Sequence, residues 1–465
     1  VGHIQSSEVI PGEYIVSVQP ASVQQLVSQA SSRSSSAASF VQEQAAGHAL
    51  VRNALGVAIA AQGTVRAQAA SPAPSIKDFS AAPELFLLRN LSSEQAEALK
   101  QQAGIQRVTP NRKVSLLATP PDLHRSQWGL HNPTSFPYSY PLPGGVVISG
   151  DSMPDFDIQA PEAWDVTTGS SDVVVAIVDS GVDAGHPDLT GNLFTNSNEI
   201  PGNQVDDDGN GVVDDYAGWN FVAKNADTRD TVSGHGTFIA GIIAAQQDNR
   251  GIVGTTWRTR YLPLKVDIGP RQLETAAIID ALRYIETLRL QGVNVRVANL
   301  SFGIDVDPGE EYRNAVQRLS DAGVLVVCAA GNEAQDNDTV TYYPQVYRFP
   351  GSITVASADP NGTLSVFSNY GRASVDIAAP GGYILSTRPR SLFQQGYSYD
   401  RGTSFAAPYV AGVAALMFAR SPSLTHVEAV SRIKSSATPR TFAQPLIVNG
   451  MLNARAAVAA ASQRA

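Results

Sequence analysis

Three polar residues stand at the ends of segments where a side chain can reach a cleft. Asp179 ends the apolar run 173–178, His235 lies between two glycines ahead of a helical run, and Ser404 begins an alanine-rich stretch. A serine hydroxyl must lose its proton as it attacks; a neutral imidazole can take that proton, and a buried carboxylate orients the imidazole. Each residue alone also fits a turn or a helix cap. Together they predict nucleophilic catalysis by serine, histidine and aspartate.

A fourth residue, Asn332, can complete this chemistry. It follows the apolar run 324–329, so its amide side chain is expected at the carboxyl end of a buried strand. The tetrahedral intermediate of acyl transfer needs hydrogen-bond donors for its oxyanion, and a side-chain amide supplies one. The start of the helix at Ser404 offers free backbone N–H groups that favour developing negative charge.

The segments 173–181, 233–237 and 402–408, in the order Asp, His, Ser, resemble the subtilisin-like serine proteases, the subtilases. The resemblance covers nearly all of residues 85–465. It implies an endopeptidase in which Asn332 and the backbone amide of Ser404 bind the oxyanion. It also implies that the segment 299–303 pairs with an extended peptide and walls a pocket for a large hydrophobic residue before the scissile bond. The substrate-binding residues expected are Ser301, Phe302, Gly303, Ala330 and Gly331.

Two positions beside the three catalytic candidates depart from the family pattern. Subtilases usually have a second histidine where this chain has Phe238, and methionine where it has Phe405. Neither position carries a proton in the mechanism, so we expect changed packing rather than lost activity. An acid-acting relative, a sedolisin, would have glutamate in place of His235. A catalytically silent or stably inhibited protease fold used for binding is the alternative from another class, although no catalytic candidate is missing.

An acidic segment predicts a calcium loop. From Asp206 onward, oxygen-bearing side chains stand at relative positions 1, 3, 5 and 9, with glycine at 6 and a backbone carbonyl at 7. An EF-hand needs glutamate at the twelfth position, where this chain has Ala217, so the loop is not an EF-hand. Close carboxylates repel one another without a cation. The expected Ca²⁺ ligands are Asp206, Asp208, Asn210, Val212, Asp214 and Asp215.

The resemblance implies a second calcium site, because subtilases bind calcium near the segments that correspond to 186–189 and 246–249. Its candidate ligands are Asp188 and Asp248.

Composition excludes other classes of function. A formal net charge of −9 over 465 residues argues against general binding to nucleic acid or to an anionic membrane surface. No run of about 18 apolar residues exists, so we predict no membrane span. The single cysteine, Cys328, excludes an intrachain disulfide and a metal cage of thiolates, and its apolar neighbours predict a core residue.

The class of enzyme and its use of calcium predict secretion, since millimolar external calcium can fill weak sites. The chain begins at Val1 without a leader, so a signal peptide is expected to be absent from this chain. We expect a monomer whose partners are protein and peptide substrates and its own propeptide.

The elements that position the catalytic candidates predict an α/β domain over residues 118–465. Apolar strands expected at 173–178, 293–300, 324–329 and 353–356 alternate with helices at 237–245, 274–290, 312–322 and 404–420. This alternation is typical of a doubly wound parallel sheet, which presents functional residues at the carboxyl ends of its strands. Residues 119–160, rich in proline, glycine and serine, are expected to form a linker draped over this domain.

Residues 1–117 predict a separate, small α+β domain. Strands are expected at 13–18, 85–88 and 105–111, and helices near 38–55 and at 92–100, where Ser92 and Gln95 form a capping box. Residues 62–83 are expected to form a loop because of their prolines. The unit from 85 to 117 resembles the subtilase propeptide, which implies an intramolecular chaperone and inhibitor that is removed by self-cleavage near 116–119.

Overall fold

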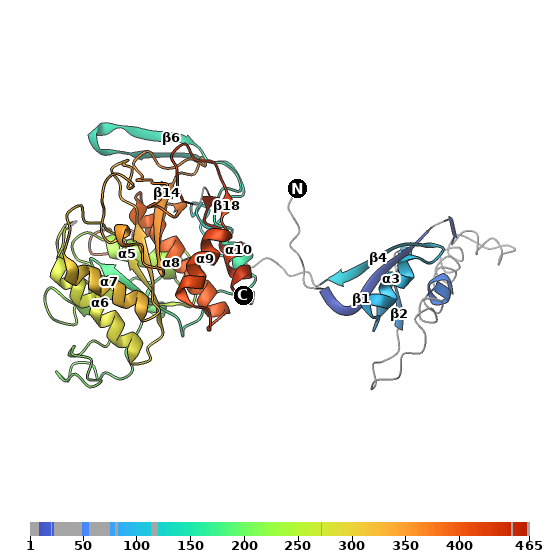
Figure 1. The fold of residues 1–465 in the computed structure, drawn as a ribbon, viewed down its shortest axis with the longest axis horizontal. Coiled ribbons are helices and arrows are strands. Elements are labelled where there is room, and N and C mark those ends of the chain that lie inside the picture. The colour runs from blue at the N-terminus through green and yellow to red at the C-terminus, as the bar shows by residue number, and fades with distance from the viewer. Residues whose placement is uncertain are drawn as a thin grey trace. The chain divides into compact units, whose positions relative to one another are not determined.

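The computed structural model describes residues 9–19, 21–22, 49–54, 75–79, 82–112, 120–270, 272–447 and 450–462. The chain divides into two compact units, Val1–Leu116 and Leu117–Ala465, which are coloured along the sequence in Figure 1.

The first unit is an antiparallel sheet with a helix. Its strands are β1 (Val9–Val18), β2 (Ser75–Phe79), β3 (Ala82–Arg89) and β4 (Ile105–Arg112), in the order β2-β3-β1-β4. Helix α3 (Ser93–Lys100) begins with the predicted capping box between Ser92 and Gln95. Val16, Phe86 and Leu99 are fully buried in its core, so these strands and the helix share one apolar interior.

The prediction of a loop over residues 62–83 is wrong for the residues that the structure describes, 75–79 and 82–83, which lie in strands. Residues 75–79 form β2, which pairs antiparallel with β3 and places Ile76 opposite Leu88. Pairing with a neighbouring strand outweighs the local proline signal here. Of the helix expected near 38–55, residues 49–54 are helical, and the rest lies outside the described residues. The expected cleavage region near 116–119 also lies outside them.

The second unit is built on a nine-stranded sheet in the order β18-β19-β15-β14-β13-β12-β7-β9-β8. Its neighbours pair in parallel except β18 with β19, so the predicted doubly wound α/β fold is confirmed. The strands are β7 (Val174–Asp179), β8 (Trp219–Asn220), β9 (Arg260–Lys265), β12 (Val295–Leu300), β13 (Leu325–Ala329), β14 (Ser352–Ala358), β15 (Ile377–Pro380), β18 (Thr438–Pro439) and β19 (Gly450–Met451).

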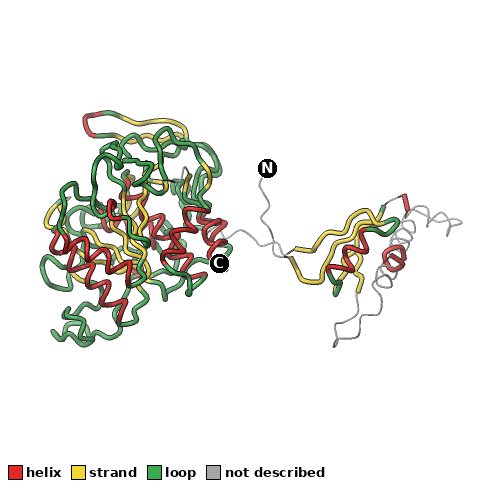
Figure 2. The backbone as a smooth tube through the Cα atoms, viewed as in Figure 1, coloured by secondary structure: helices red, strands yellow, loops and turns green. Residues whose placement is uncertain are grey.

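Helices cover both faces of this sheet (Figure 2). One core holds α5 (His235–Ala244), α8 (Thr403–Arg420), α9 (His426–Ser435) and α10 (Ala454–Ala461), and the other holds α6 (Thr275–Leu290) and α7 (Glu310–Asp321). Alternate residues of β13 enter different cores: Leu325 and Val327 belong to the first, Val326 and Cys328 to the second. The cysteine is therefore buried core, as predicted.

The segment expected to be a linker contains regular structure. Residues 137–151 form a hairpin of β5 (Pro137–Pro141) and β6 (Val147–Asp151), joined through the short 3₁₀ turn η1 (Pro143–Gly145). Tyr138 and Tyr140 alternate with exposed residues along β5, a period-two pattern that the proline and glycine content hid. The remaining short elements are α4 (Ala160–Trp164), η2 (Thr190–Asn192), β10 (Asp267–Gly269), β11 (Gln272–Leu273), η3 (Gln345–Tyr347), β16 (Ile384–Thr387) and β17 (Tyr397–Asp400).

Candidate active site and cation site

A cavity of about 530 Å³ lies at the carboxyl ends of the central strands. Its wall holds the carboxylate at the end of β7, the imidazole at the start of α5, the hydroxyl near the start of α8 and an amide beyond β13. The segment after β12 completes this part of the wall. The predicted residues that line it are Asp179, His235, Ser301, Phe302, Gly303, Asn332 and Ser404.

Asp179 is fixed by the end of its strand. It is 2% exposed, and its Oδ1 accepts hydrogen bonds from the backbone N of Ser180 and from His235 Nδ1, both at 2.8 Å. Its Oδ2 is buried and has no hydrogen-bond partner in the described structure. The glycine after His235 permits this approach, because a Cβ on Gly236 would lie 2.2 Å from the carbonyl oxygen of Gly181. The carboxylate therefore orients the imidazole through one oxygen.

His235 begins α5 after Gly234, whose φ of 72° suits glycine. Its side chain is 31% exposed and faces the cavity. Burial lowers the pKa of His235, but the charge of Asp179 and its hydrogen bond outweigh that effect, so the pKa is raised above 6.5. An imidazole of this kind is suited to accept and return a proton near neutral pH.

Sequence reasoning missed the residue that fixes this turn, Asp230. It is 1% exposed, and its carboxylate accepts from the backbone N of Gly234 at 2.9 Å, the backbone N of Thr237 at 3.2 Å and Thr237 Oγ1 at 3.0 Å. Gly234 caps α5 and Thr237 lies in its first turn, where backbone N–H groups have no helical partner. An acid a few residues before a helix start was the available signal.

Ser404 and Ser301 are joined by two hydrogen bonds. Ser404 Oγ donates to the carbonyl oxygen of Ser301 at 2.9 Å, and Ser301 Oγ donates to the carbonyl oxygen of Ser404 at 2.8 Å. In this rotamer the hydroxyl proton of Ser404 points to Ser301 and not to His235. Catalytic hydrogen bonds are commonly loose or misaligned before substrate binds.

Asn332 has a defined orientation. Its Oδ1 accepts from the backbone N of Thr403 at 2.8 Å and from Thr403 Oγ1 at 3.1 Å. Because a backbone N–H can only donate, the oxygen must face Thr403, and the amide nitrogen is left for the cavity.

Ala330 and Gly331 do not line the cavity. Ala330 is fully buried, and Gly331 donates its backbone N–H to Thr403 Oγ1 at 3.1 Å. Gly331 has φ 113°, and a Cβ there would lie 2.4 Å from Asn369 Nδ2. These two residues therefore support the backbone that leads to Asn332 and are not part of the cavity surface.

The two phenylalanines that depart from the family pattern pack behind the imidazole. The Phe405 ring lies 5.3 Å from the His235 ring and 4.3 Å from the Phe238 ring, centroid to centroid. The guanidinium of Arg388 lies 4.6 Å from the centroid of Phe238, and Arg388 forms an ion pair with Asp400. Arg388 also donates to the carbonyl oxygen of Gly234 at 3.1 Å. A cation and two aromatic rings thus fill the space beside His235.

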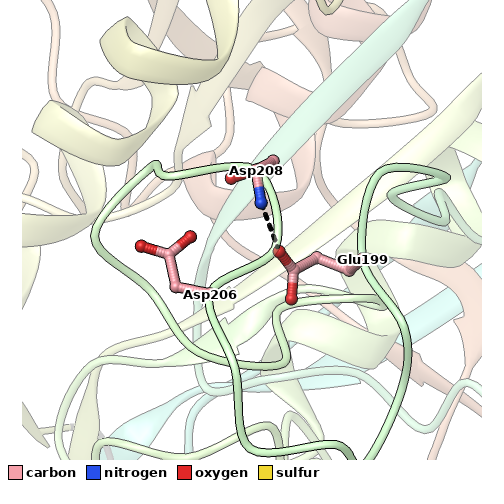
Figure 3. Close-up of side chains that lie close together, drawn as sticks. All are labelled: Glu199, Asp206 and Asp208. Carbon is pink, nitrogen blue, oxygen red and sulfur yellow. Dashed lines mark hydrogen bonds between the residues drawn. The ribbon is translucent and has the colours of Figure 1, made fainter.

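The acidic loop brings a different set of carboxylates together than its spacing predicts. Glu199, Asp206 and Asp208 present oxygens that all lie within 4.8 Å of one another (Figure 3). Glu199 was missed because it stands outside the loop spacing. Its Oε1 accepts from the backbone N of Asp207 at 2.9 Å and of Asp208 at 3.1 Å, whereas its buried Oε2 has no partner in the described structure. Burial raises the pKa of Glu199.

The other predicted ligands have separate roles in the structure. Asp214 accepts from the backbone N–H groups of residues 202–204, at 2.7 to 3.1 Å, and is not a member of the cluster. Asp215 is fully buried and accepts from Asn210 Nδ2 at 2.9 Å and from the hydroxyl of Tyr284. Val212 donates its backbone N–H to Asn210 Oδ1 at 2.8 Å.

The two carboxylates of the second predicted calcium site accept hydrogen bonds from different donors. Asp188 accepts from the Tyr397 hydroxyl at 3.0 Å and from the backbone N of Ile252 at 2.9 Å. Asp248 Oδ2 accepts from Gln246 Nε2 at 2.8 Å. Sequence reasoning missed Asp122, which is 5% exposed, accepts from the backbone N of Asp248 at 2.8 Å and leaves its Oδ1 without a partner in the described structure.

This arrangement of a carboxylate, an imidazole, a hydroxyl and an amide in one cavity is typical of serine hydrolases, and comparison with known proteins identifies the family. The sequence model of the subtilase family matches residues 170–454, so the chain belongs to the subtilases and is a serine endopeptidase. The fold is subtilisin-like.

Individual relatives agree with this placement. Thermitase of Thermoactinomyces vulgaris is 35% identical over 302 residues, which is 65% of this chain and 93% of thermitase. Subtilisin-like protease 2 of Plasmodium falciparum is 34% identical over 250 residues, which is 54% of this chain but 17% of that longer protein. A solved protease from Pseudoalteromonas arctica is 30% identical with a TM-score of 0.52, covering 66% of this chain and 94% of that one. Among the described residues, no helix has the length and apolar character needed to cross a membrane.

Proposed function

We propose that residues 118–465 hydrolyse peptide bonds through an acyl-enzyme, with Ser404 as nucleophile, His235 as base and Asp179 as its orienting acid. The observation that carries this proposal is the 2.8 Å contact between His235 Nδ1 and the buried carboxylate of Asp179, in the same cavity that Ser404 lines.

The reaction begins when the Ser404 hydroxyl turns from the carbonyl of Ser301 toward Nε2 of His235. Oγ then attacks the substrate carbonyl carbon, and the proton passes to His235, whose charged form Asp179 stabilises. The oxyanion receives hydrogen bonds from the amide nitrogen of Asn332 and the backbone N–H of Ser404. His235 returns the proton to the leaving amine, and water later hydrolyses the acyl-enzyme by the same route.

We further propose that the enzyme is secreted as a monomeric zymogen and that residues 1–117 act as its chaperone and inhibitor. Support comes from the separate compact unit Val1–Leu116, with its own buried core of Val16, Phe86 and Leu99. A protease that is joined to such a unit in one chain can remove it by self-cleavage.

Calcium fits the cluster of Glu199, Asp206 and Asp208. All three offer hard oxygen ligands, and the buried Oε2 of Glu199 lacks any other partner in the described structure. A cation there would offset the mutual repulsion of the carboxylates and fix the loop. The partnerless oxygen of Asp122, beside Asp248, supports a second calcium site near Asp188.

The first test is replacement of the nucleophile. Ser404→Ala is expected to lower peptide hydrolysis on the order of 10⁶-fold while leaving the unfolding temperature near that of the wild type. A phosphonate probe for active serines should label the wild type and not the variant. If the wild type has lost residues 1–117 and is still neither active nor labelled, the fold is catalytically silent and the proposal is wrong.

A further inference from the structure

The β5–β6 hairpin lies ahead of the part of the chain that matches the subtilase family, residues 170–454. Figure 1 shows it as an extended ribbon, labelled β6, along one edge of the second unit. The proposed catalytic steps do not require this hairpin. Its role is therefore inferred from the residues that it contacts.

Aromatic side chains attach the hairpin firmly to the unit. Tyr138 and Tyr140 are 3% and 5% exposed. The Tyr140 hydroxyl donates to the carboxylate of Asp359, at 2.8 and 2.9 Å from its two oxygens, and Asp359 is itself 2% exposed. The Tyr138 ring lies 6.1 Å from that of Tyr383, which stacks on Tyr399 at 4.4 Å. A buried hydrogen bond and a tilted contact between aromatic rings attach the hairpin to the unit.

The tip of the hairpin forms part of the catalytic cavity. Leu142 and Pro143 line the same cavity as His235, Asn332 and Ser404. The tip is closed by a hydrogen bond from the backbone N of Leu142 to the carbonyl oxygen of Val146, at 2.6 Å. A side chain that binds the cavity will therefore meet an apolar surface that this hairpin supplies.

The hairpin contacts two residues, Phe367 and Arg401, that line the cavity near Ser404. Tyr140 contacts Phe367 with ring centroids 6.4 Å apart, and the Arg401 guanidinium lies 5.6 Å from the Tyr140 ring. Phe367 and Arg401 also line the cavity, and Arg401 stands between β17 and Ser404. The segment after β12, which the family resemblance implies pairs with the peptide ahead of the scissile bond, supplies other lining residues, Ser301, Phe302 and Gly303.

We infer that the hairpin tip, through Leu142 and Pro143, binds the substrate beyond the scissile bond and selects peptides with an apolar residue there. An extended peptide that runs along Ser301 and Gly303 to Ser404 passes next to the wall of Phe367 and the hairpin tip. Leu142, Pro143 and Phe367 give this wall an apolar surface. The inference rests on the proposed endopeptidase activity of the same cavity.

The test compares substrates that share the residues before the scissile bond. One substrate is a p-nitroanilide, which has no amino acid after the scissile bond. The other two are fluorogenic peptides that have leucine or serine at the second position after the scissile bond. The double variant Leu142→Ser/Pro143→Ser is compared with Val146→Ser/Val147→Ser. The latter changes two exposed residues of the same hairpin, 54% and 59% exposed, that do not line the cavity. Each full-length preparation is first incubated with calcium so that residues 1–117 can be released, and its active sites are then titrated with a phosphonate probe.

For the tip variant, the ratio of kcat/KM for the leucine peptide to that for the anilide should fall about ten-fold, the size expected when an apolar contact is lost. The leucine-over-serine preference should fall with it, and the control variant should keep both ratios. Unchanged ratios in the tip variant, or equal falls in both variants, would overturn the inference about the tip. A wild type that has lost residues 1–117 and is still neither labelled nor able to cleave the anilide would instead overturn the proposed function on which the inference rests.

Discussion

Asn332 shows how a single side chain can serve both structure and chemistry. Its oxygen accepts the N–H of Thr403, the residue before Ser404, and that bond turns its nitrogen toward the cavity. The same contact therefore positions the start of α8 and aims the proposed oxyanion donor. A substitution must separate these two contributions to be informative.

Asn332→Asp separates them, because it keeps an oxygen for Thr403 but replaces the donor nitrogen with an acceptor. We expect kcat to fall at least 10²- to 10³-fold with little change in KM, since the lost bond forms only with the oxyanion. Steady-state kinetics on a p-nitroanilide measure both constants. Asn332→Ala should show a similar loss of kcat. Full activity in the Asp variant would remove Asn332 from the oxyanion site.

The acid limb of the pH profile reports on His235. Only the neutral imidazole can accept the Ser404 proton, so kcat/KM should rise with pH through the pKa of His235, which lies above 6.5. Asp400 contributes to raising that pKa, and Arg388 opposes it. Asp400→Asn removes the first effect and leaves Arg388 without its carboxylate, so the limb should move to lower pH. A limb that stays in place or moves upward would contradict this electrostatic coupling.

At the scale of elements, the acidic loop is a set of backbone turns closed by carboxylates. Asp206, Asp208 and Asp214 each accept backbone N–H groups of neighbouring residues, and so the loop keeps its shape partly through its own hydrogen bonds. The buried Oε2 of Glu199 has no hydrogen-bond partner in the described structure, and it lies beside the carboxylates of Asp206 and Asp208. The loop is therefore expected to respond to calcium through Glu199 and not through Asp214.

Chelation with EDTA should lower the unfolding temperature of the wild type by several degrees, and calcium should restore it. A ligand at about 100 times its Kd stabilises by about 2.7 kcal/mol. Glu199→Gln should reduce this calcium-dependent shift. Asp214→Asn changes an acid of the same loop and should keep the wild-type shift, even if its unfolding temperature is lower throughout. Thermal unfolding with calcium and with EDTA tests both variants; no shift in the wild type would remove the calcium proposal.

At the scale of the whole molecule, the two compact units give the proposed zymogen a direct test. Incubated with calcium, the wild type should shorten by about the mass of residues 1–117, because the second unit would cut the segment near 116–119. Ser404→Ala should stay whole under the same conditions. Intact mass over time and sequencing of the new N-terminus measure this. Shortening of the Ala variant at the same rate would show that another protease makes the cut.

The sequence alone determined the fold class and the catalytic candidates, because both depend on local patterns. Buried parallel strands are apolar throughout, and Asp179, His235, Asn332 and Ser404 stand at ends of elements that such a sheet gathers at one edge. Capping at Ser92 and the core position of Cys328 were equally local.

Tertiary structure decided what depends on partners distant in the chain. Glu199 joins the acidic cluster from outside the loop, and Asp122 meets Asp248 across 126 residues. The β5–β6 hairpin was hidden among prolines and glycines because its stability comes from burying Tyr138 and Tyr140 against residues far along the chain, such as Asp359 and Tyr383. Local propensity cannot encode such contacts, since their free energy arises only when separate segments fold together.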